Sequence, residues 1–219
     1  MPKWGMVIDL RKCINCKACV VACTQTNKVP LESRRKVFDF GVDQENDGLR
    51  ISIPMSCMQC DEPPCLDVCP TKATYVRPDG IVGIDTDLCI GCGYCIVGCP
   101  YNTRSIIEDD TSVPGGDMVE KNGLKSFLGT CTKCDFCADK VDAGIEQGLI
   151  PGLDSDASPS CVNMCTANAL HFGDLEDPES KVSKLIESEN VECLHPEIGT
   201  NPSLYYIIPE GYTLTKNKK

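Results

Sequence analysis

Apolar and polar residues follow each other in short runs along this chain, and two apolar runs lead directly into loops that contain cysteine. These runs are residues 6–9 and 81–85, and each predicts a short strand. After the third cysteine of each loop, a second apolar run indicates the start of a helix. Residues 36–53 alternate between apolar and polar positions on both sides of a polar turn containing glycine, which predicts a β-hairpin.

Two further segments are polar and contain several glycines or prolines. They are residues 108–123 and residues 138–160, and we expect both to be surface loops. The longest apolar runs are interrupted by cysteine, and none approaches the roughly 18 residues that a membrane-spanning helix needs. We therefore expect no direct insertion of this chain into a membrane.

The C-terminal part of the chain predicts one helix and a tail that favours strand. Ser180 is a suitable helix cap, and apolar residues with helical spacing follow it: Val182, Leu185 and Ile186. Residues 203–219 are rich in β-prone side chains. Three tyrosines in this tail either contact another subunit or pack on the chain's own core: Tyr205, Tyr206 and Tyr212.

Composition changes this picture, because large side chains are scarce and cysteine is abundant. Of the 219 residues only 5% are aromatic, whereas 18 are cysteine. A secreted disulfide scaffold is the poorer interpretation, since the opening MPKWGMVIDLRKC has no apolar leader segment. The formal net charge of −11 is spread along the chain and would repel phosphates, which excludes a nucleic-acid partner.

The cysteines form a repeat. Residues 8–23 read IDLRKCINCKACVVAC and residues 84–99 read IDTDLCIGCGYCIVGC, so both are copies of one structural unit. A second pattern, CMQCDEPPCLDVCP at residues 57–70, has a looser counterpart split between residues 133–137 and 160–170. In chain order these are motifs one to four, with four cysteines each, and they use all but two of the 18 cysteines.

The spacing of these cysteines is typical of iron–sulfur proteins. C-x2-C-x2-C-x3-C followed by proline is the pattern of bacterial [4Fe–4S] ferredoxins. Motif three matches it in full through Cys99 and Pro100, and motif one lacks only the proline. Three cysteines on a tight loop reach three corners of a cubane, while the fourth binds the other cluster of a pair. Cys23 is therefore expected to bind a different cluster from the three cysteines before it.

Zinc is the alternative metal, because paired C-x2-C spacings such as Cys57/Cys60 resemble zinc ligands. Triplets that end in x3-C do not resemble them, and the chain has only two histidines. We therefore favour iron–sulfur clusters over zinc.

Two cysteines and both histidines lie outside the motifs. Cys131 precedes Cys134 by three residues, so CTKCDFC also offers an alternative triplet. We choose Cys134 and Cys137 as ligands, because the partner motif needs only one C-x2-C pair, and expect Cys131 to be a free thiol nearby. Cys193 is expected to serve packing. For His171 and His195 we expect surface or core positions rather than metal ligation.

The resemblance to a known family rests on most of the chain. It is carried by GMVIDLRKCINCKACVVAC, CMQCDEPPCLDVCPTKA, IDTDLCIGCGYCIVGCPYNTR, TKCDFCADKVDAGI, CVNMCTANALHFGDLEDPESKVSKLI and the ending GTNPSLYYI. With these segments the chain resembles the four-cluster iron–sulfur (beta) subunit of the dimethyl sulfoxide reductase family of molybdenum and tungsten oxidoreductases. Similar subunits serve polysulfide, thiosulfate, tetrathionate and arsenate reductases.

This resemblance implies an α+β fold of two bacterial-ferredoxin-like (βαββαβ-type) modules, one nested in the other. The first module takes residues 1–33 and 125–179, with motifs one and four. The second takes residues 54–107, with motifs two and three. Residues 34–53 are a hairpin insertion and residues 180–219 a C-terminal extension. The spacing alone also allows two modules in tandem.

The resemblance further implies four [4Fe–4S] clusters, since cysteine fills all the ligand positions. The implied ligand sets are Cys13, Cys16, Cys19 and Cys165 for cluster 1; Cys23, Cys134, Cys137 and Cys161 for cluster 2; Cys57, Cys60, Cys65 and Cys99 for cluster 3; and Cys69, Cys89, Cys92 and Cys95 for cluster 4. Thr166 stands where a proline often follows the last cysteine, a departure that removes no ligand.

The expected function is electron transfer without catalysis. The sequence contains no G-x-S-x-G elbow, P-loop or dinucleotide fingerprint. The resemblance implies a catalytic partner with a molybdenum or tungsten bis-pterin cofactor, facing the first module. It places a membrane quinone subunit or a soluble carrier at the second module, as in anaerobic respiration.

Two alternatives stay open at this point. A free-standing polyferredoxin shuttle would suit the acidic charge, which steers encounters with basic partners. Residues 34–53 and 175–219 favour the subunit instead, because a shuttle hardly needs such extensions. The remote alternative is a structural protein that holds a redox-silent metal.

Location is open as well. The sequence shows no export signal of its own. The chain is expected either in the cytoplasm or in the periplasm, carried there by a catalytic partner with a twin-arginine signal.

Overall fold

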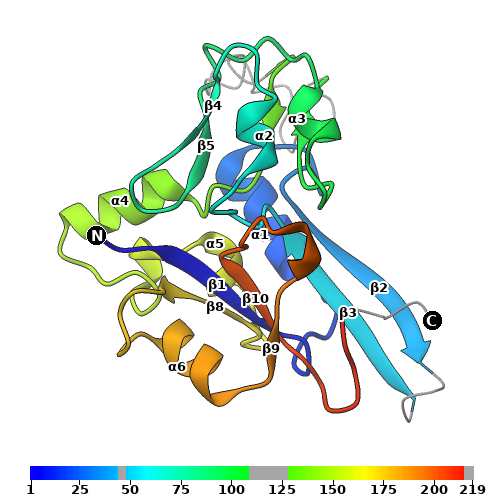
Figure 1. Ribbon diagram of the computed structural model, residues 1–219. Coiled ribbons are helices and arrows are strands. Elements are labelled where there is room, and N and C mark those ends of the chain that lie inside the picture. Colours follow the sequence, from blue (N-terminus) through cyan, green and yellow to red (C-terminus); the bar gives the residue numbers. More distant parts are fainter. Residues whose placement is uncertain (44–47, 109–127, 215–219) are drawn as a thin grey trace.

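The largest sheet of the protein pairs the first strand of the chain with strands from its C-terminal part (Figure 1). The computed structural model describes residues 1–43, 48–108 and 128–214. The strands of this sheet, in the order β8-β1-β10-β9, are β8 (Leu170–Asp174), β1 (Trp4–Asp9), β10 (Leu204–Ile207) and β9 (Val191–Glu192). β1 pairs in parallel with β10 and antiparallel with β8, so the first strand of the chain lies between two of the last.

The two faces of this sheet bury different partners. Met6 and Ile8 of β1 point into the main core, whereas Val7 packs with Val182 of helix α6 (Lys181–Ser188) on the other face. Because both faces are covered, β1 is buried over its whole length, and its sequence is a nearly continuous apolar run rather than an alternating one.

The helix and the strand predicted near the C-terminus are confirmed. α6 begins after Ser180, whose hydroxyl accepts a hydrogen bond from the Ser183 N–H at 3.1 Å and so caps the helix. Tyr206 in β10 is fully buried, and its hydroxyl donates to the Pro54 carbonyl at 3.1 Å. Tyr206 therefore packs on the chain's own core rather than on another subunit.

The predicted hairpin at residues 36–53 is confirmed as β2 (Arg35–Asp43) and β3 (Leu49–Ser56). These strands pair antiparallel from Arg35 opposite Ser56, with an irregularity between Asp39 and Val42. The alternating pattern places Val37, Ile51 and Ile53 in the core and leaves other apolar side chains of β2 exposed: Phe38, Phe40 and Val42. The hairpin projects away from the sheet (Figure 1).

A smaller unit lies above the sheet in Figure 1. It contains the one-turn helices α2 (Pro64–Asp67) and α3 (Tyr94–Val97), joined through the antiparallel strands β4 (Thr74–Val76) and β5 (Val82–Ile84). β5 confirms the strand predicted at residues 81–85. The short strands β6 (Ser105–Ile106) and β7 (Cys131–Thr132) then pair and lead the chain back towards the main sheet.

The helices of motifs one and three begin two residues earlier than predicted. α1 (Ala18–Asn27) and α3 each start just before the third cysteine of their motif rather than after it. In both motifs the preceding residue has a positive φ, 57° at Lys17 and 76° at Gly93. This left-handed residue ends the loop, and the next residue can therefore open the helix.

The prediction of a surface loop at residues 138–160 was wrong in its first half. Those residues form helix α4 (Ala138–Glu146), and a 3₁₀ turn (Ser155–Ala157) and helix α5 (Ser160–Asn163) follow. α4 buries Val141 and Gly144, which are three residues apart, and Gly144 packs directly against Ala157. The loop predicted at residues 108–123 lies almost wholly outside the described residues.

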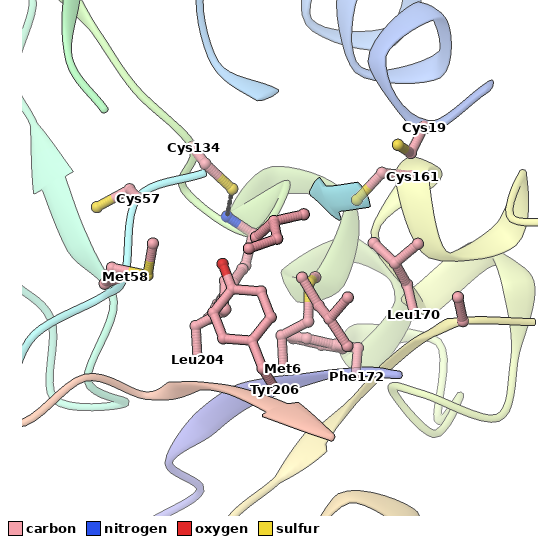
Figure 2. Close-up of a cluster of buried hydrophobic side chains, with 14 of the residues drawn as sticks. Met6, Cys19, Cys57, Met58, Cys134, Cys161, Leu170, Phe172, Leu204 and Tyr206 are labelled. Atoms are coloured by element: carbon pink, nitrogen blue, oxygen red, sulfur yellow. Dashed lines mark hydrogen bonds between the residues drawn. The ribbon is translucent and has the colours of Figure 1, made fainter. Parts of the chain in front are cut away.

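One main apolar cluster joins the sheet to the cysteine loops (Figure 2). Phe172 stacks on Trp4 at 5.5 Å between ring centroids and meets Phe136 edge-on at 5.3 Å. Cysteines of motifs one, two and four belong to the same cluster, including Cys57 and Cys161. The molecule is thus an α+β fold in which the cysteines themselves form part of the core. Within the residues that the structure describes, no helix is long and apolar enough to cross a membrane.

Candidate metal centres

The structure gathers the cysteines of the four motifs into groups of four thiols. Thiol group 1 surrounds a small cavity, lined by Cys13, Cys16, Cys19 and Cys165. The loop of motif one supplies the first three, and Cys165 follows helix α5. Because α1 packs against α5, the two chain segments meet at this cavity.

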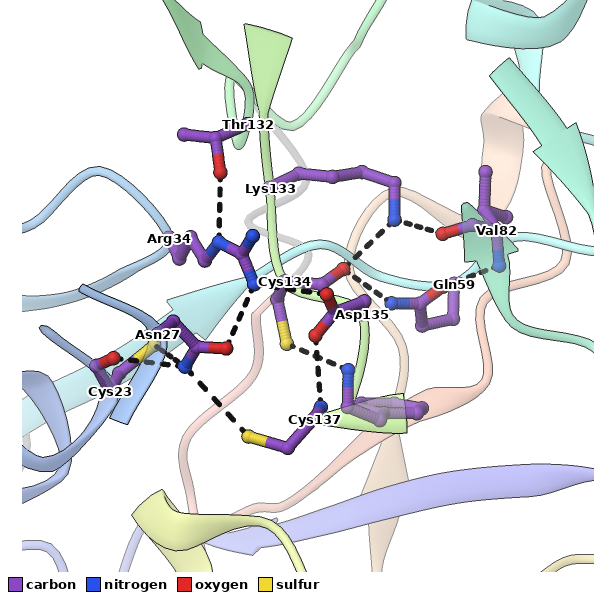
Figure 3. Close-up of polar contacts among 11 residues, drawn as sticks. Cys23, Asn27, Arg34, Gln59, Val82, Thr132, Lys133, Cys134, Asp135 and Cys137 are labelled. Atoms are coloured by element: carbon purple, nitrogen blue, oxygen red, sulfur yellow. Dashed lines mark hydrogen bonds and ion pairs between the residues drawn. The ribbon is translucent and has the colours of Figure 1, made fainter. Parts of the chain in front are cut away.

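Thiol group 2 combines the last cysteine of motif one with three from motif four. Burial, followed by the charges of Cys134, Cys161 and Cys137, raises the pKa of Cys23, which places these four thiols together. The side-chain amide of Asn27 lies 3.6 Å from the Cys23 sulfur and 3.9 Å from the Cys137 sulfur, so it can donate to either (Figure 3). Asn27 therefore spans two thiols of the group.

Thiol groups 3 and 4 are drawn from motifs two and three in the same way. Group 3 contains Cys57, Cys60, Cys65 and Cys99: burial and the charges of Cys57 and Cys99 raise the pKa of both Cys60 and Cys65. Group 4 lines a second small cavity and contains Cys69, Cys89, Cys92 and Cys95. In each pair of groups, the last cysteine of one motif therefore lies with the first three cysteines of the other motif.

The two cysteines outside the motifs have different surroundings. Cys131 also lines the cavity of group 4, with its sulfur 3.5 Å from that of Cys95. The hydrogen bond between the two thiols lowers the pKa of Cys95 to about 6. Cys193 is half-buried beyond the groups, and burial raises its pKa to about 11.

Backbone N–H groups point at several of the motif sulfurs. Ala169 N–H donates to Cys165 at 3.2 Å, and Phe136 N–H donates to Cys134 at 3.5 Å. For Cys69, donors that include the Thr74 N–H outweigh burial and lower the pKa of the thiol. Bonds of this kind stabilise negative charge on sulfur and help to set the reduction potential of a bound cluster.

Burial disfavours the deprotonated, negatively charged form of most of these cysteines. It raises the pKa of Cys60 and of Cys161 to about 12 each. Two buried arginines oppose this effect: Arg35 near groups 1 and 2, and Arg104 near groups 3 and 4. The Arg104 guanidinium donates to the Cys65 sulfur at 2.9 Å.

A polar bridge joins group 2 to the smaller unit (Figure 3). Gln59 donates to the Cys134 carbonyl at 2.6 Å and accepts from the Val82 N–H at 2.8 Å. The Lys133 ammonium donates to the same Cys134 carbonyl at 2.9 Å and to the Val82 carbonyl. Motif two, motif four and strand β5 are therefore held together by buried hydrogen bonds.

Sequence reasoning missed the polar side chains of this site. Arg35, Gln59, Arg104 and Lys133 are buried, but none is a cysteine, so the ligand spacing gives none of them a role. The one available signal was proximity along the chain, since Gln59 lies inside motif two and Lys133 directly precedes Cys134.

The residues present suit a [4Fe–4S] cluster at each group. Every group offers four sulfur donors, the ligand set that such clusters use. Arg35 supports the fit independently: it is buried, and its Nε and Nη1 have no hydrogen-bond partner among the described residues. In the same residues, no three histidine, cysteine or carboxylate side chains converge tightly enough for a single metal ion.

Neither histidine joins a thiol group. His195 is exposed, with its Nδ1 3.0 Å from the Glu197 carboxylate. His171 lies in β8 and is buried, and burial together with the charges of Lys181 and Lys12 lowers its pKa to about 4 from 6.5.

We expect acid to destabilise the fold through His171. The unfolded chain takes up a proton near pH 6.5 and the folded chain only near pH 4, so stability falls as the pH drops through this window. At pH 5.5 the cost is about 1 kcal/mol, and a His171→Gln protein should escape it. Thermal unfolding midpoints at pH 7.5 and 5.5 measure the difference, with His195→Gln as the exposed control. An equal acid shift in wild type and His171→Gln would contradict the assignment.

The chain matches two family models, each described as a 4Fe-4S dicluster domain. One covers residues 12–73 and the other residues 50–118. Together with the 18 cysteines, these matches support four [4Fe–4S] clusters.

Curated relatives match almost the whole chain. The B chain of polysulfide reductase from Wolinella succinogenes is 38% identical and is covered over 94% of both chains. The putative iron–sulfur B subunit of dimethyl sulfoxide reductase from Halobacterium salinarum is 37% identical, over 94% of this chain and 79% of its own. The B subunit of selenate reductase from Mesobacillus selenatarsenatis is 36% identical, over 94% of this chain and 72% of its own. The chain therefore belongs to the family of iron–sulfur B subunits, the [4Fe–4S] electron-transfer subunits of reductase complexes.

Proposed function

We propose that this chain carries electrons along four [4Fe–4S] clusters between a molybdenum or tungsten bis-pterin catalytic subunit and a second redox partner. That partner is either a membrane quinone subunit or a soluble carrier. When bound, each cluster accepts and releases one electron. The protein's own part is to hold the clusters in line, to exclude water from them and to set their potentials.

The observation that carries this proposal is the gathering of the sixteen motif cysteines into four groups of four. We assign thiol groups 1 to 4 as the ligands of clusters 1 to 4, each through its four cysteine thiolates. The shared apolar cluster and the bridge of Gln59 and Lys133 support a continuous path from group 2 to group 3.

The strand pairing supports a nested arrangement of two modules. β1 precedes motif one and pairs with β8, which follows motif four. β4 follows motif two and pairs with β5, which precedes motif three. We therefore propose residues 1–33 and 125–179 as the first module and residues 54–107 as the second. The hairpin at residues 34–53 and the C-terminal residues 180–219 are extensions that hold them together.

Exposed apolar side chains mark both ends of the proposed path. Around group 1, Cys16 is exposed beside Ile14, which is 68% exposed. Around group 4, Cys92 is exposed beside Ile90 and near Val97, which are 67% and 89% exposed. Such patches are typical of interaction sites. We propose that the catalytic subunit binds over group 1 and that the second partner binds over group 4.

Elemental analysis tests this function. The native complex should be purified anaerobically without a tag on this chain, and iron, molybdenum and tungsten should be measured across the eluted fractions. We expect about sixteen iron atoms per chain, together with molybdenum or tungsten and a large second chain in near-stoichiometric amount. Iron that elutes with this chain alone would instead indicate the free-standing polyferredoxin, for which the net charge of −11 is the favourable observation.

A further inference from the structure

Arg35 is buried, and no described carboxylate pairs with it. It opens strand β2, is 1% exposed, and donates from Nη2 to the Ser56 hydroxyl at 3.1 Å and to the Met6 sulfur at 3.2 Å. Its other two nitrogens have no hydrogen-bond partner in the described part of the chain. An arginine cannot lose its proton under such conditions, so a buried negative charge must balance it.

The groups whose charges act most strongly on Arg35 are thiols. Cys161, Cys134, Cys19 and Cys23 all act on its charge, and the first two act most strongly. Cys19 belongs to group 1, whereas the other three belong to group 2. Arg35 therefore interacts with both groups of the first proposed module, and more strongly with group 2.

Arg104 has the corresponding position in the second proposed module. It is 3% exposed, donates to the Cys65 sulfur at 2.9 Å and to the Thr74 hydroxyl at 3.2 Å. Cys65 and Cys57 of group 3 act on its charge most strongly, and Cys95 of group 4 follows. Each module thus holds one buried guanidinium between its two thiol groups, with the stronger effect on the inner group.

We propose that Arg35 and Arg104 are the fixed countercharges of the two cluster pairs, and that each raises chiefly the reduction potential of the inner cluster, cluster 2 or cluster 3. The proposal rests on the cluster assignment of the proposed function. Adding an electron to a cluster adds negative charge, and a nearby buried cation stabilises that reduced form more than the oxidised one. Water cannot screen the effect at these buried positions.

Redox titration followed by electron paramagnetic resonance tests this role in the intact complex. Replacing the charge in Arg35→Gln should lower the equilibrium constant for reduction of cluster 2 by about tenfold, which corresponds to about 59 mV for one electron. Cluster 1 should shift less. Arg104→Gln should do the same to cluster 3, with a smaller shift in cluster 4. Arg35→Lys and Arg104→Lys keep the charge and should stay near the wild-type potentials.

The control is Arg77→Gln. Arg77 already pairs with Asp79 and Asp142, at 2.8 Å and 2.7 Å, so its removal should leave all four potentials unchanged. The proposal is overturned if both arginine-to-glutamine proteins keep their full iron content and their equilibrium constants for reduction stay within twofold of wild type. If a glutamine variant loses iron, the lysine variant decides: iron loss or a tenfold shift there would also overturn it.

The proposed function fails under a different result. If the wild-type complex itself holds fewer than four clusters, or no redox-active iron, the cluster assignment is wrong. If it holds four clusters and the arginine variants have the wild-type potentials, the cluster assignment stands and the proposed countercharge role is wrong.

Discussion

Replacing Cys161 by alanine should remove cluster 2 and interrupt electron transfer in the middle of the proposed row of four clusters. Cys161 is buried and lies with Cys23, Cys134 and Cys137. Loss of one thiolate from a site closed to solvent leaves an iron without a ligand. We expect iron to fall by about four of sixteen atoms per chain. Single-turnover electron flow from the catalytic partner to the opposite end should be lost.

The matched control is Cys193→Ala. Cys193 is a half-buried thiol that belongs to none of the four groups, and we expect full iron and full electron flow. Iron analysis and stopped-flow reduction measure both proteins under the same anaerobic conditions. A full iron content in Cys161→Ala would contradict the assignment of this thiol as a ligand.

The second large effect is expected from Gly91→Ala in motif three. Gly91 has a φ of +67°, and a Cβ placed there would lie 2.0 Å from the Gly129 carbonyl oxygen. Because that atom belongs to the backbone, it cannot turn aside as a flexible side chain could. We expect a loss of about 3 kcal/mol or more in the free energy of unfolding, together with loss of iron from group 4. Thermal unfolding and iron content measure the two effects.

Gly129→Ala separates the two causes of this loss. Gly129 also has a positive φ, +73°, but a Cβ there meets none of the described residues within 4 Å. Its substitution should therefore cost only the backbone strain, about 1 kcal/mol. Equal losses at the two positions would mean that the close approach to the Gly129 carbonyl has no effect.

The sequence predicts best those elements whose signal is local. The hairpin of β2 and β3 follows from alternation on both sides of a turn, and α6 follows from the Ser180 cap and the helical spacing behind it. The cysteine motifs are local signals of the same kind. Their spacing alone places three thiols of each ferredoxin motif on one loop.

Elements that depend on tertiary packing were harder to predict. α4 has few apolar residues, and it is held by the contact of Gly144 with Ala157 rather than by a long apolar stripe. β6 and β7 are only two residues each and pair across a long stretch of chain. In both cases the stabilising partner is distant in sequence, so no short window shows it.

The buried charges were not predictable for a similar reason. An arginine such as Arg35, which stands between Arg34 and Lys36, normally lies at the surface. Nothing in its neighbours indicates that it is buried among thiols from three segments of the chain. The sequence therefore predicts which residues can hold the clusters, but not which side chains balance their charge.

The position of β1 has a consequence for synthesis of the protein. The ribosome makes β1 well before both of its sheet neighbours, β8 and β10. Residues 54–107 can fold while the chain is still growing, because both strands of their β4–β5 pair are made close together. The four-stranded sheet can form only after β8 and β10 have been made, and Cys13 can meet Cys165 only after that later segment has been made. Maturation therefore proceeds from the middle of the chain outwards, and a nascent chain released early exposes an unpaired β1.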